Sequence, residues 1–256
     1  TLNGPAIAGT PNNLITTAAS GMVFGGSFPG ITIPSSVSQL GSLTISNPNG
    51  VSLSGPLSTA SLGFTAGILH TGVTNLLTIT NTDPGSISGV SETSHINGPL
   101  ARNLRANLTN SATPYVFPIG NEGEYRPLEL LNISTGLISP VILVTMSNTG
   151  AVSGDGSTIK GISPRNWRVE TVSGDFTSAL IRLTENGLDG NSLIGRSASQ
   201  SGNYTSAGGS DIGTTITAWI VAIKITKYGL IITGIAGLFY MFGKHERTRF
   251  VAMLIM

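Results

Sequence analysis

The chain has 256 residues and a formal net charge of +1, with 10% charged and 39% hydrophobic residues, 34 glycines and no cysteine. So little charge argues against a fold of solvated helices and favours short strands with tight turns. The lack of cysteine excludes disulfides, thiolate metal sites and a cysteine nucleophile. Residues 1–215 carry eight basic and eleven acidic residues, a balance that argues against nucleic acid as a partner, because phosphate binding needs a basic face.

The first part of the chain carries short apolar groups that recur from Leu14 to about Ser91. Their spacing of about eight to twelve residues, with alternation inside each group, is typical of stacked short strands with one face inward. Turn clusters separate them at Asn47–Gly50 and Asp83–Gly85. We therefore predict an all-β fold in which residues 1–94 form a right-handed β-solenoid-like repeat region. The apolar groups are Leu43–Ile45, Val51–Leu53, Leu62–Phe64, Ile68–Leu69, Leu76–Ile79 and Ile87.

The composition changes between Ser91 and Arg126, where charged and aromatic residues concentrate. Beyond this junction, apolar and polar residues alternate in segments such as Asn166–Glu170 and Ala179–Thr184, which indicates sheets with one solvent-exposed face. We predict that residues 95–217 form an antiparallel β-sandwich-like module. Its expected strands are Leu128–Ile133, Val141–Met146, Trp167–Val172, Ala179–Thr184 and Leu193–Arg196.

Residues 218–256 form a hydrophobic tail, in which Tyr228–Phe242 is fifteen residues without a charge and a basic cluster, Lys244–Arg249, follows. Extended back to Trp219, the segment reaches about the 20 residues of a single membrane helix, with the body outside. Two alternatives stay open: buried strands over Ile216–Thr226 and Leu230–Phe242, or an assembly segment. The residues expected to carry the membrane or assembly role are Trp219, Tyr228, Leu230, Ile231, Ile235, Leu238, Phe239 and Phe242.

Several strings occur in an order that resembles the repeat modules of large surface proteins and adhesins exported by bacteria with type IX secretion. They are Leu43–Gly55, Leu76–Ile79, His95–Arg102, Tyr115–Gly120 with Tyr125–Leu128, Arg165–Val169, Ile181–Thr184 and Ser201–Gly209. The resemblance covers about residues 14–217 and implies export, surface display and adhesion or matrix formation. It implies no catalytic residue, and it ends at the hydrophobic tail.

The segment Phe117–Pro127 is the most individual in the chain. Tyr125 and Arg126 are candidate ligand-binding residues, because an aromatic ring and a forked donor suit a glycan or a protein. Alternatively, Arg126 pairs with Glu122 or Glu124 and fixes a hairpin. Trp167, between two arginines, is a further candidate for stacking on sugar, or else an inward core residue.

No residue pattern indicates catalysis or a bound metal. His70, His95 and His245 lack metal-ligand spacing, and Glu122 with Glu124 lies in a turn sequence. The pairs Asp155-Gly156 and Asp189-Gly190 are typical of hairpin turns rather than of calcium loops. We therefore expect no catalytic residue, no metal and no cofactor.

Together these patterns predict a non-catalytic bacterial surface protein, structural or adhesive, located outside the cell and anchored at its C-terminus if the tail contacts a membrane. Expected partners are other copies, neighbouring surface repeats, glycans, or host and abiotic surfaces. Two alternatives remain: a self-assembling extracellular filament or sheath subunit, and a carbohydrate-active enzyme on a β-solenoid.

Overall fold

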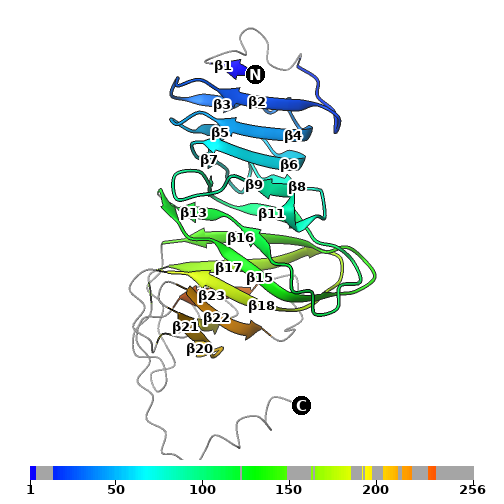
Figure 1. Ribbon diagram of the computed structural model, residues 1–256, viewed down its shortest axis with the longest axis vertical. Helices are drawn as coiled ribbons and strands as arrows, with labels where there is room; N and C mark the ends of the chain where they lie inside the picture. Colours follow the sequence, from blue (N-terminus) through cyan, green and yellow to red (C-terminus); the bar gives the residue numbers. More distant parts are fainter. Residues whose placement is uncertain are drawn as a thin grey trace, which may run out of the picture.

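The computed structural model describes residues 1–3, 14–121, 123–148, 163, 165–185, 192, 194–197, 204–212, 215–220 and 230–234. These residues form strands and one 3-10 turn, η2 (Pro84–Ser86), with no α-helix among them, which confirms the all-β prediction (Figure 1). The strands are β1 (Leu2–Asn3), β2 (Gly21–Gly25), β3 (Ile31–Ile33), β4 (Gln39–Ser46), β5 (Val51–Leu53), β6 (Leu57–Ala66), β7 (Leu69–His70), β8 (Leu77–Ile79), β9 (Ile87–Ser88), β10 (Ile96–Asn97), β11 (Leu100–Asn103), β12 (Tyr115–Phe117), β13 (Ile119–Asn121), β14 (Glu124–Tyr125), β15 (Leu128–Thr135), β16 (Val141–Ser147), β17 (Asn166–Ser173), β18 (Phe176–Thr184), β19 (Ile194–Ser197), β20 (Thr205–Ser206), β21 (Ser210–Ile212), β22 (Thr215–Ile220) and β23 (Leu230–Gly234).

The first half of the chain is a β-solenoid of about five turns, as predicted. One column of parallel strands runs β2, β4, β6, β8 and β11, and a second runs β3, β5, β7, β10 and β13. Figure 1 shows these turns stacked along the long axis of the molecule. The parallel pairing continues past residue 94 and ends at β13.

Aliphatic residues in register fill the interior of the solenoid. In the second column one apolar residue from each turn aligns with the next, and all five are buried. Their neighbours Thr32, Ser52 and His70 point the other way, because side chains alternate between the faces of a strand. The short apolar groups of the sequence therefore become a continuous core. The aligned residues are Ile31, Val51, Leu69, Ile96 and Ile119.

Asparagine side chains tie successive turns together where the chain reverses. The amide of Asn47 is buried; its Nδ2 donates to the carbonyl oxygen of Phe28 at 2.8 Å, and its Oδ1 accepts from the Asn49 amide at 3.0 Å. Asn75 Nδ2 likewise donates to the carbonyl oxygen of Leu53 at 3.0 Å. These bonds satisfy backbone groups that the parallel ladder leaves unpaired at its ends.

After the solenoid the pairing becomes antiparallel. The first column extends through β16, β17, β23, β19 and β20, and a further sheet has the order β12, β15, β18, β22 and β21. Strands occur at all five positions predicted between residues 128 and 196. One buried cluster, from Phe24 to Ile194, runs through both parts, so the described chain shares a single core.

Two segments of the predicted tail are paired strands. In β22, Trp219 lies opposite Leu180 of β18, and in β23, Leu230 and Ile231 lie opposite Val169 and Arg168 of β17. Among the described residues no helix has the length and apolarity to cross a membrane. The other predicted tail residues, Tyr228, Ile235, Leu238, Phe239 and Phe242, lie outside the described residues.

Candidate functional site

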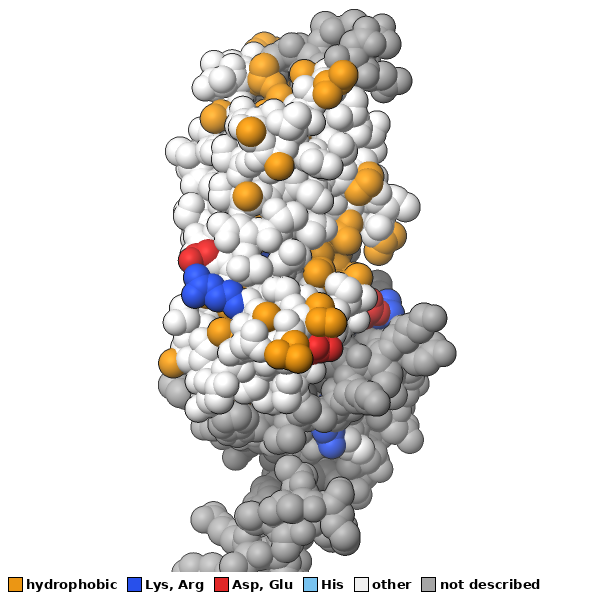
Figure 2. Space-filling model, turned by 90° about the vertical axis from the view of Figure 1, so that its right-hand side faces the viewer, with side chains coloured by type: hydrophobic (Ala, Val, Ile, Leu, Met, Phe, Trp, Pro, Cys, Tyr) orange, Lys and Arg blue, Asp and Glu red, His pale blue; other side chains and the backbone are white. Residues whose placement is uncertain are grey.

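Charge is distributed very unevenly along the fold. Residues 1–82 contain no Asp, Glu, Lys or Arg. On the face drawn in Figure 2 the upper turns accordingly show only hydrophobic and uncharged polar side chains, and acidic and basic groups begin lower down. Acidic and basic side chains therefore concentrate where the solenoid meets the antiparallel strands, in three groups of residues.

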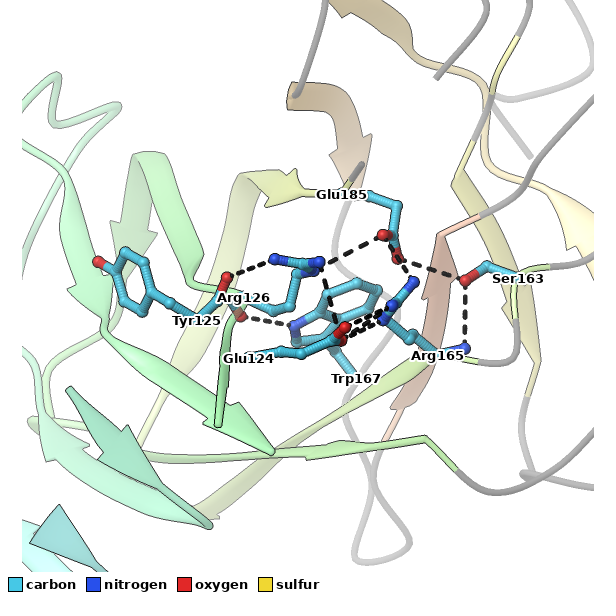
Figure 3. Close-up of polar contacts among 7 residues, drawn as sticks. All are labelled: Glu124, Tyr125, Arg126, Ser163, Arg165, Trp167 and Glu185. Carbon is cyan, nitrogen blue, oxygen red and sulfur yellow. Dashed lines mark hydrogen bonds and ion pairs between the residues drawn. The ribbon is translucent and has the colours of Figure 1, made fainter. Parts of the chain in front are cut away.

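The first group is an ionic cluster of two arginines and two glutamates (Figure 3). Arg165 binds Glu124 with two hydrogen bonds, Nε to Oε2 at 2.8 Å and Nη2 to Oε1 at 3.0 Å, and its Nη1 donates to Glu185 Oε1 at 2.9 Å. Arg126 lies 3.6 Å from Glu185 Oε1 through Nε and 3.7 Å from Glu124 Oε2 through Nη2. The guanidinium groups thus lie between the two carboxylates, and the cluster is electrically neutral.

The predicted ligand residues lie in and around this cluster. Trp167 is fully buried, and its Nε1 donates to the carbonyl oxygen of Arg126 at 3.1 Å. The Arg126 side chain is only 10% exposed. Tyr125 is half-buried, and its ring centroid lies 5.2 Å from that of the buried His95. The structure therefore brings Arg126 and Trp167 together inside the protein, where they present little or no surface to a ligand. The ring of Tyr125 points away from them (Figure 3) and packs on His95.

The pairing of Arg126 with Glu124 matches the structural alternative considered from the sequence, whereas Glu122 lies outside the described residues. Burial lowers the pKa of His95, and backbone groups of Ser91 and Glu92 oppose that shift. Burial likewise raises the pKa of Tyr125. Both shifts favour the uncharged forms of the two rings.

The second group centres on Arg102, a buried arginine that sequence reasoning did not single out. Its guanidinium donates to the carbonyl oxygens of Asp83, Pro84 and Val116 and to Ser86 Oγ. Burial lowers its pKa to about 10, so it stays protonated at neutral pH. The sequence contained one indication of this burial, because side chains alternate along a strand and Arg102 therefore lies on the same inward face of β11 as Leu100.

Aromatic rings complete the surroundings of Arg102. Its Cζ lies 5.4 Å from the centroid of the Tyr115 ring and 5.9 Å from that of Phe117, distances at which the ring faces attract a cation. The guanidinium thus joins the η2 turn to strand β12. This contact fixes the relative position of two segments more than 25 residues apart in the chain.

The third group lines a surface pocket of about 240 Å³ beside this junction. Arg105 Nη2 lies 2.8 Å from Asp83 Oδ2, and each side chain is 52% exposed. Asp83 Oδ1 accepts from the Gly85 amide at 2.8 Å. Tyr115 Oη donates to the carbonyl oxygen of Thr82 at 2.6 Å and accepts from the Arg105 amide at 3.2 Å. The remaining wall includes Pro84, Leu108 and Ser111.

Metal ligation has no site in the part of the chain that the structure describes, since no three His, Cys, Asp or Glu side chains gather there. Of the weaker candidates, His245, Asp155 and Asp189 fall outside the described residues. His70 is exposed, and its Nδ1 lies within hydrogen-bond distance of Asn97 Nδ2, at 3.3 Å.

Comparison with known proteins gives one local similarity. Residues 203–256 match a family model described as Na+/Pi-cotransporter. This match covers less than a quarter of the chain and does not assign the chain to that family. No curated protein and no solved structure matches the chain.

Proposed function

We propose that this chain is a non-catalytic bacterial cell-surface module, structural or adhesive, built on a rigid β-solenoid. The observation that carries the proposal is the uncharged first part: residues 1–82 hold no Asp, Glu, Lys or Arg, yet they form most of the stacked turns. Such a surface offers hydroxyl and amide groups for many weak contacts. It offers no carboxylate for acid and base chemistry.

The ionic cluster supports the same proposal. Glu124 and Glu185 meet on the guanidinium of Arg165, but both are held in ion pairs and the Glu185 side chain is only 4% exposed. A glycosidase needs one carboxyl group to protonate a leaving oxygen and a second facing the sugar in a groove. A neutral, largely buried cluster favours a structural role over an enzyme on a β-solenoid.

We propose that the solenoid is right-handed and that the antiparallel strands after it form a sandwich-like module, since the two sheets bury alternate residues in one core. The order of sequence strings supports export by type IX secretion. The uncharged residues that follow β23, up to Phe242, and the cotransporter match of residues 203–256 support membrane contact through the tail.

Immunolabelling of intact cells tests the proposal. An antibody raised against the purified chain should label unpermeabilised cells of the source bacterium, and brief external protease treatment should remove the label. A cytoplasmic marker that stays unlabelled until the cells are permeabilised is the control. Cells lacking the gene should attach less well to a surface or to one another, because contacts of this kind act in large numbers. Label that appears only after permeabilisation would contradict the proposal.

A further inference from the structure

We infer that the pocket between Asp83 and Arg105 binds one ring of a neutral carbohydrate. The inference rests on the proposed function, because it supplies the surface module with a ligand class. Three features of the pocket carry it: its size, its paired charges and its rigid support.

The size of the pocket limits the ligand to a small molecule. Its volume of about 240 Å³ lies below the about 300 to 1,000 Å³ of sites for drug-sized ligands. Pro84 and Leu108, both partly exposed, supply an apolar wall beside the buried ring of Tyr115, while Ser111 supplies a hydroxyl. A single sugar ring presents the matching combination, because it has C–H faces and a rim of hydroxyl groups.

The charges of the pocket select a neutral ligand. Asp83 and Arg105 compensate each other at 2.8 Å, so an anion would meet the carboxylate and a cation would meet the guanidinium. A carboxylate only accepts hydrogen bonds and a guanidinium only donates them, whereas a hydroxyl does both. Adjacent hydroxyl groups can therefore bind both side chains without breaking the pair. Bonds of this kind, with one charged partner, are stronger than those between neutral groups.

The pocket is preorganised by groups that lie behind it. Arg102 holds the η2 turn, which carries Asp83, against β12, which carries Tyr115. Asp83 Oδ1 is fixed by the Gly85 amide, which leaves Oδ2 directed to Arg105. A site whose walls are already in place loses little conformational freedom when it binds. Binding of one ring is still weak, and many copies on a surface would multiply it.

Saturation-transfer NMR on the purified full chain tests the inference. The probes are the methyl glycosides of glucose, galactose, mannose and N-acetylglucosamine, with glucuronate as an anionic probe and glycine as a zwitterionic probe. At least one neutral glycoside should bind with millimolar affinity.

Arg105→Gln and Asp83→Asn should each weaken that binding about tenfold or more, through loss of a charged hydrogen bond. Arg168→Gln is the matched control, because Arg168 is also half-exposed and pairs with Glu170 of the same strand, β17, and this variant should bind as the parent does.

Thr113→Trp provides a variant that keeps the ion pair. Thr113 is exposed at the rim of the pocket, so the larger side chain should block the pocket without disturbing the core. Binding should be lost while the circular dichroism spectrum is unchanged. The inference is overturned if no neutral glycoside binds, if glucuronate or glycine binds better, or if binding survives both Arg105→Gln and Thr113→Trp. Any of these results leaves the surface labelling of intact cells, and with it the proposed function, unaffected.

Discussion

The indole Nε1 of Trp167 donates a hydrogen bond of 3.1 Å to the carbonyl oxygen of Arg126. This bond joins β17 to the segment that leads from β14 to β15, and Figure 3 shows Trp167 beside the side chains of the ionic cluster. The solenoid and the antiparallel strands are thus joined by a polar contact between residues 41 positions apart, in addition to their shared apolar core.

Substitution of Glu185 should destabilise the chain strongly. In Glu185→Ala the guanidinium groups of Arg126 and Arg165 lose a buried carboxylate partner, and breaking a buried ion pair costs about 3 to 5 kcal/mol. Urea unfolding of the full chain, followed by circular dichroism, measures the change.

The matched control is Glu129→Ala. Glu129 pairs with Arg182, whose side chain is 36% exposed, so its loss should cost about 1 kcal/mol or less. Equal losses of stability in the two variants would show that the cluster is not the interior contact described above.

Arg102→Ala should also lower the free energy of unfolding, by about 3 kcal/mol or more. The substitution removes the donor for three backbone carbonyl oxygens, and each buried group left unsatisfied costs about 1 to 3 kcal/mol. Arg105→Ala, which removes the half-exposed partner of Asp83, should change the same quantity by about 1 kcal/mol or less. The midpoints of urea unfolding of the two variants measure these changes. An Arg102→Ala chain that unfolds at the same urea concentration as the parent would contradict the structural role of this residue.

Local patterns in this sequence predict structure better than distant contacts do. The strands and the solenoid were predictable, because alternation and turn residues are local signals that the parallel ladders preserve. The pairing of Arg126 with Glu124 was also local. The contacts of Arg165 with Glu124 and Glu185 span 41 and 20 positions, so only the folded chain brings them together.

Arg102 illustrates a different limit. Its inward position followed from alternation with Leu100, but an arginine at such a position normally argues against burial. The carbonyl oxygens that make burial possible come from η2 and β12, whose approach no spacing in the sequence reveals. The same holds for Asp83 and Arg105, 22 positions apart.

The stability of the chain should fall between pH 7 and pH 5.5 in part because of His95. Burial lowers the pKa of His95 in the folded state below the unfolded value of 6.5. As the pH falls below 6.5, the unfolded chain therefore binds a proton that the folded chain does not bind. The stabilisation is therefore complete above pH 6.5 and is lost as the pH falls toward the folded pKa. One such group changes the free energy of unfolding by at most about 1.4 kcal/mol per pH unit.

His95→Phe should flatten this part of the pH profile, because phenylalanine keeps a ring against Tyr125 but does not titrate. His70→Gln should have a smaller effect on the slope, since burial lowers the pKa of His70 as well but its side chain is exposed. Urea unfolding at pH 7, 6.5, 6 and 5.5 gives the slopes. An unchanged slope in His95→Phe would show that His95 is protonated equally in both states.

A glycine at the turn between β6 and β7 should be the least tolerant position in the solenoid reversals. Gly67 has φ +90°, and an added Cβ would lie 1.7 Å from the carbonyl oxygen of Asn47 in the turn of the preceding coil. No rotation of a side chain relieves that contact, because the Cβ position is fixed by the Gly67 backbone and its neighbour is a backbone oxygen. Gly67→Ala should therefore force adjacent turns apart and lower the free energy of unfolding by more than about 4 kcal/mol, at the upper end of the effects of single substitutions.

Two other glycines are controls. Gly30 has φ +71° with nothing within 4 Å of an added Cβ, so Gly30→Ala should lower the free energy of unfolding by only about 1 to 2 kcal/mol, the cost of a left-handed backbone. Gly72→Ala, with open space and no positive φ, should leave stability unchanged or raise it by up to about 1 kcal/mol. Thermal unfolding of the three variants should rank them in this order, and a Gly67→Ala chain as stable as Gly72→Ala would mean that neighbouring turns are not stacked as closely as the structure has them.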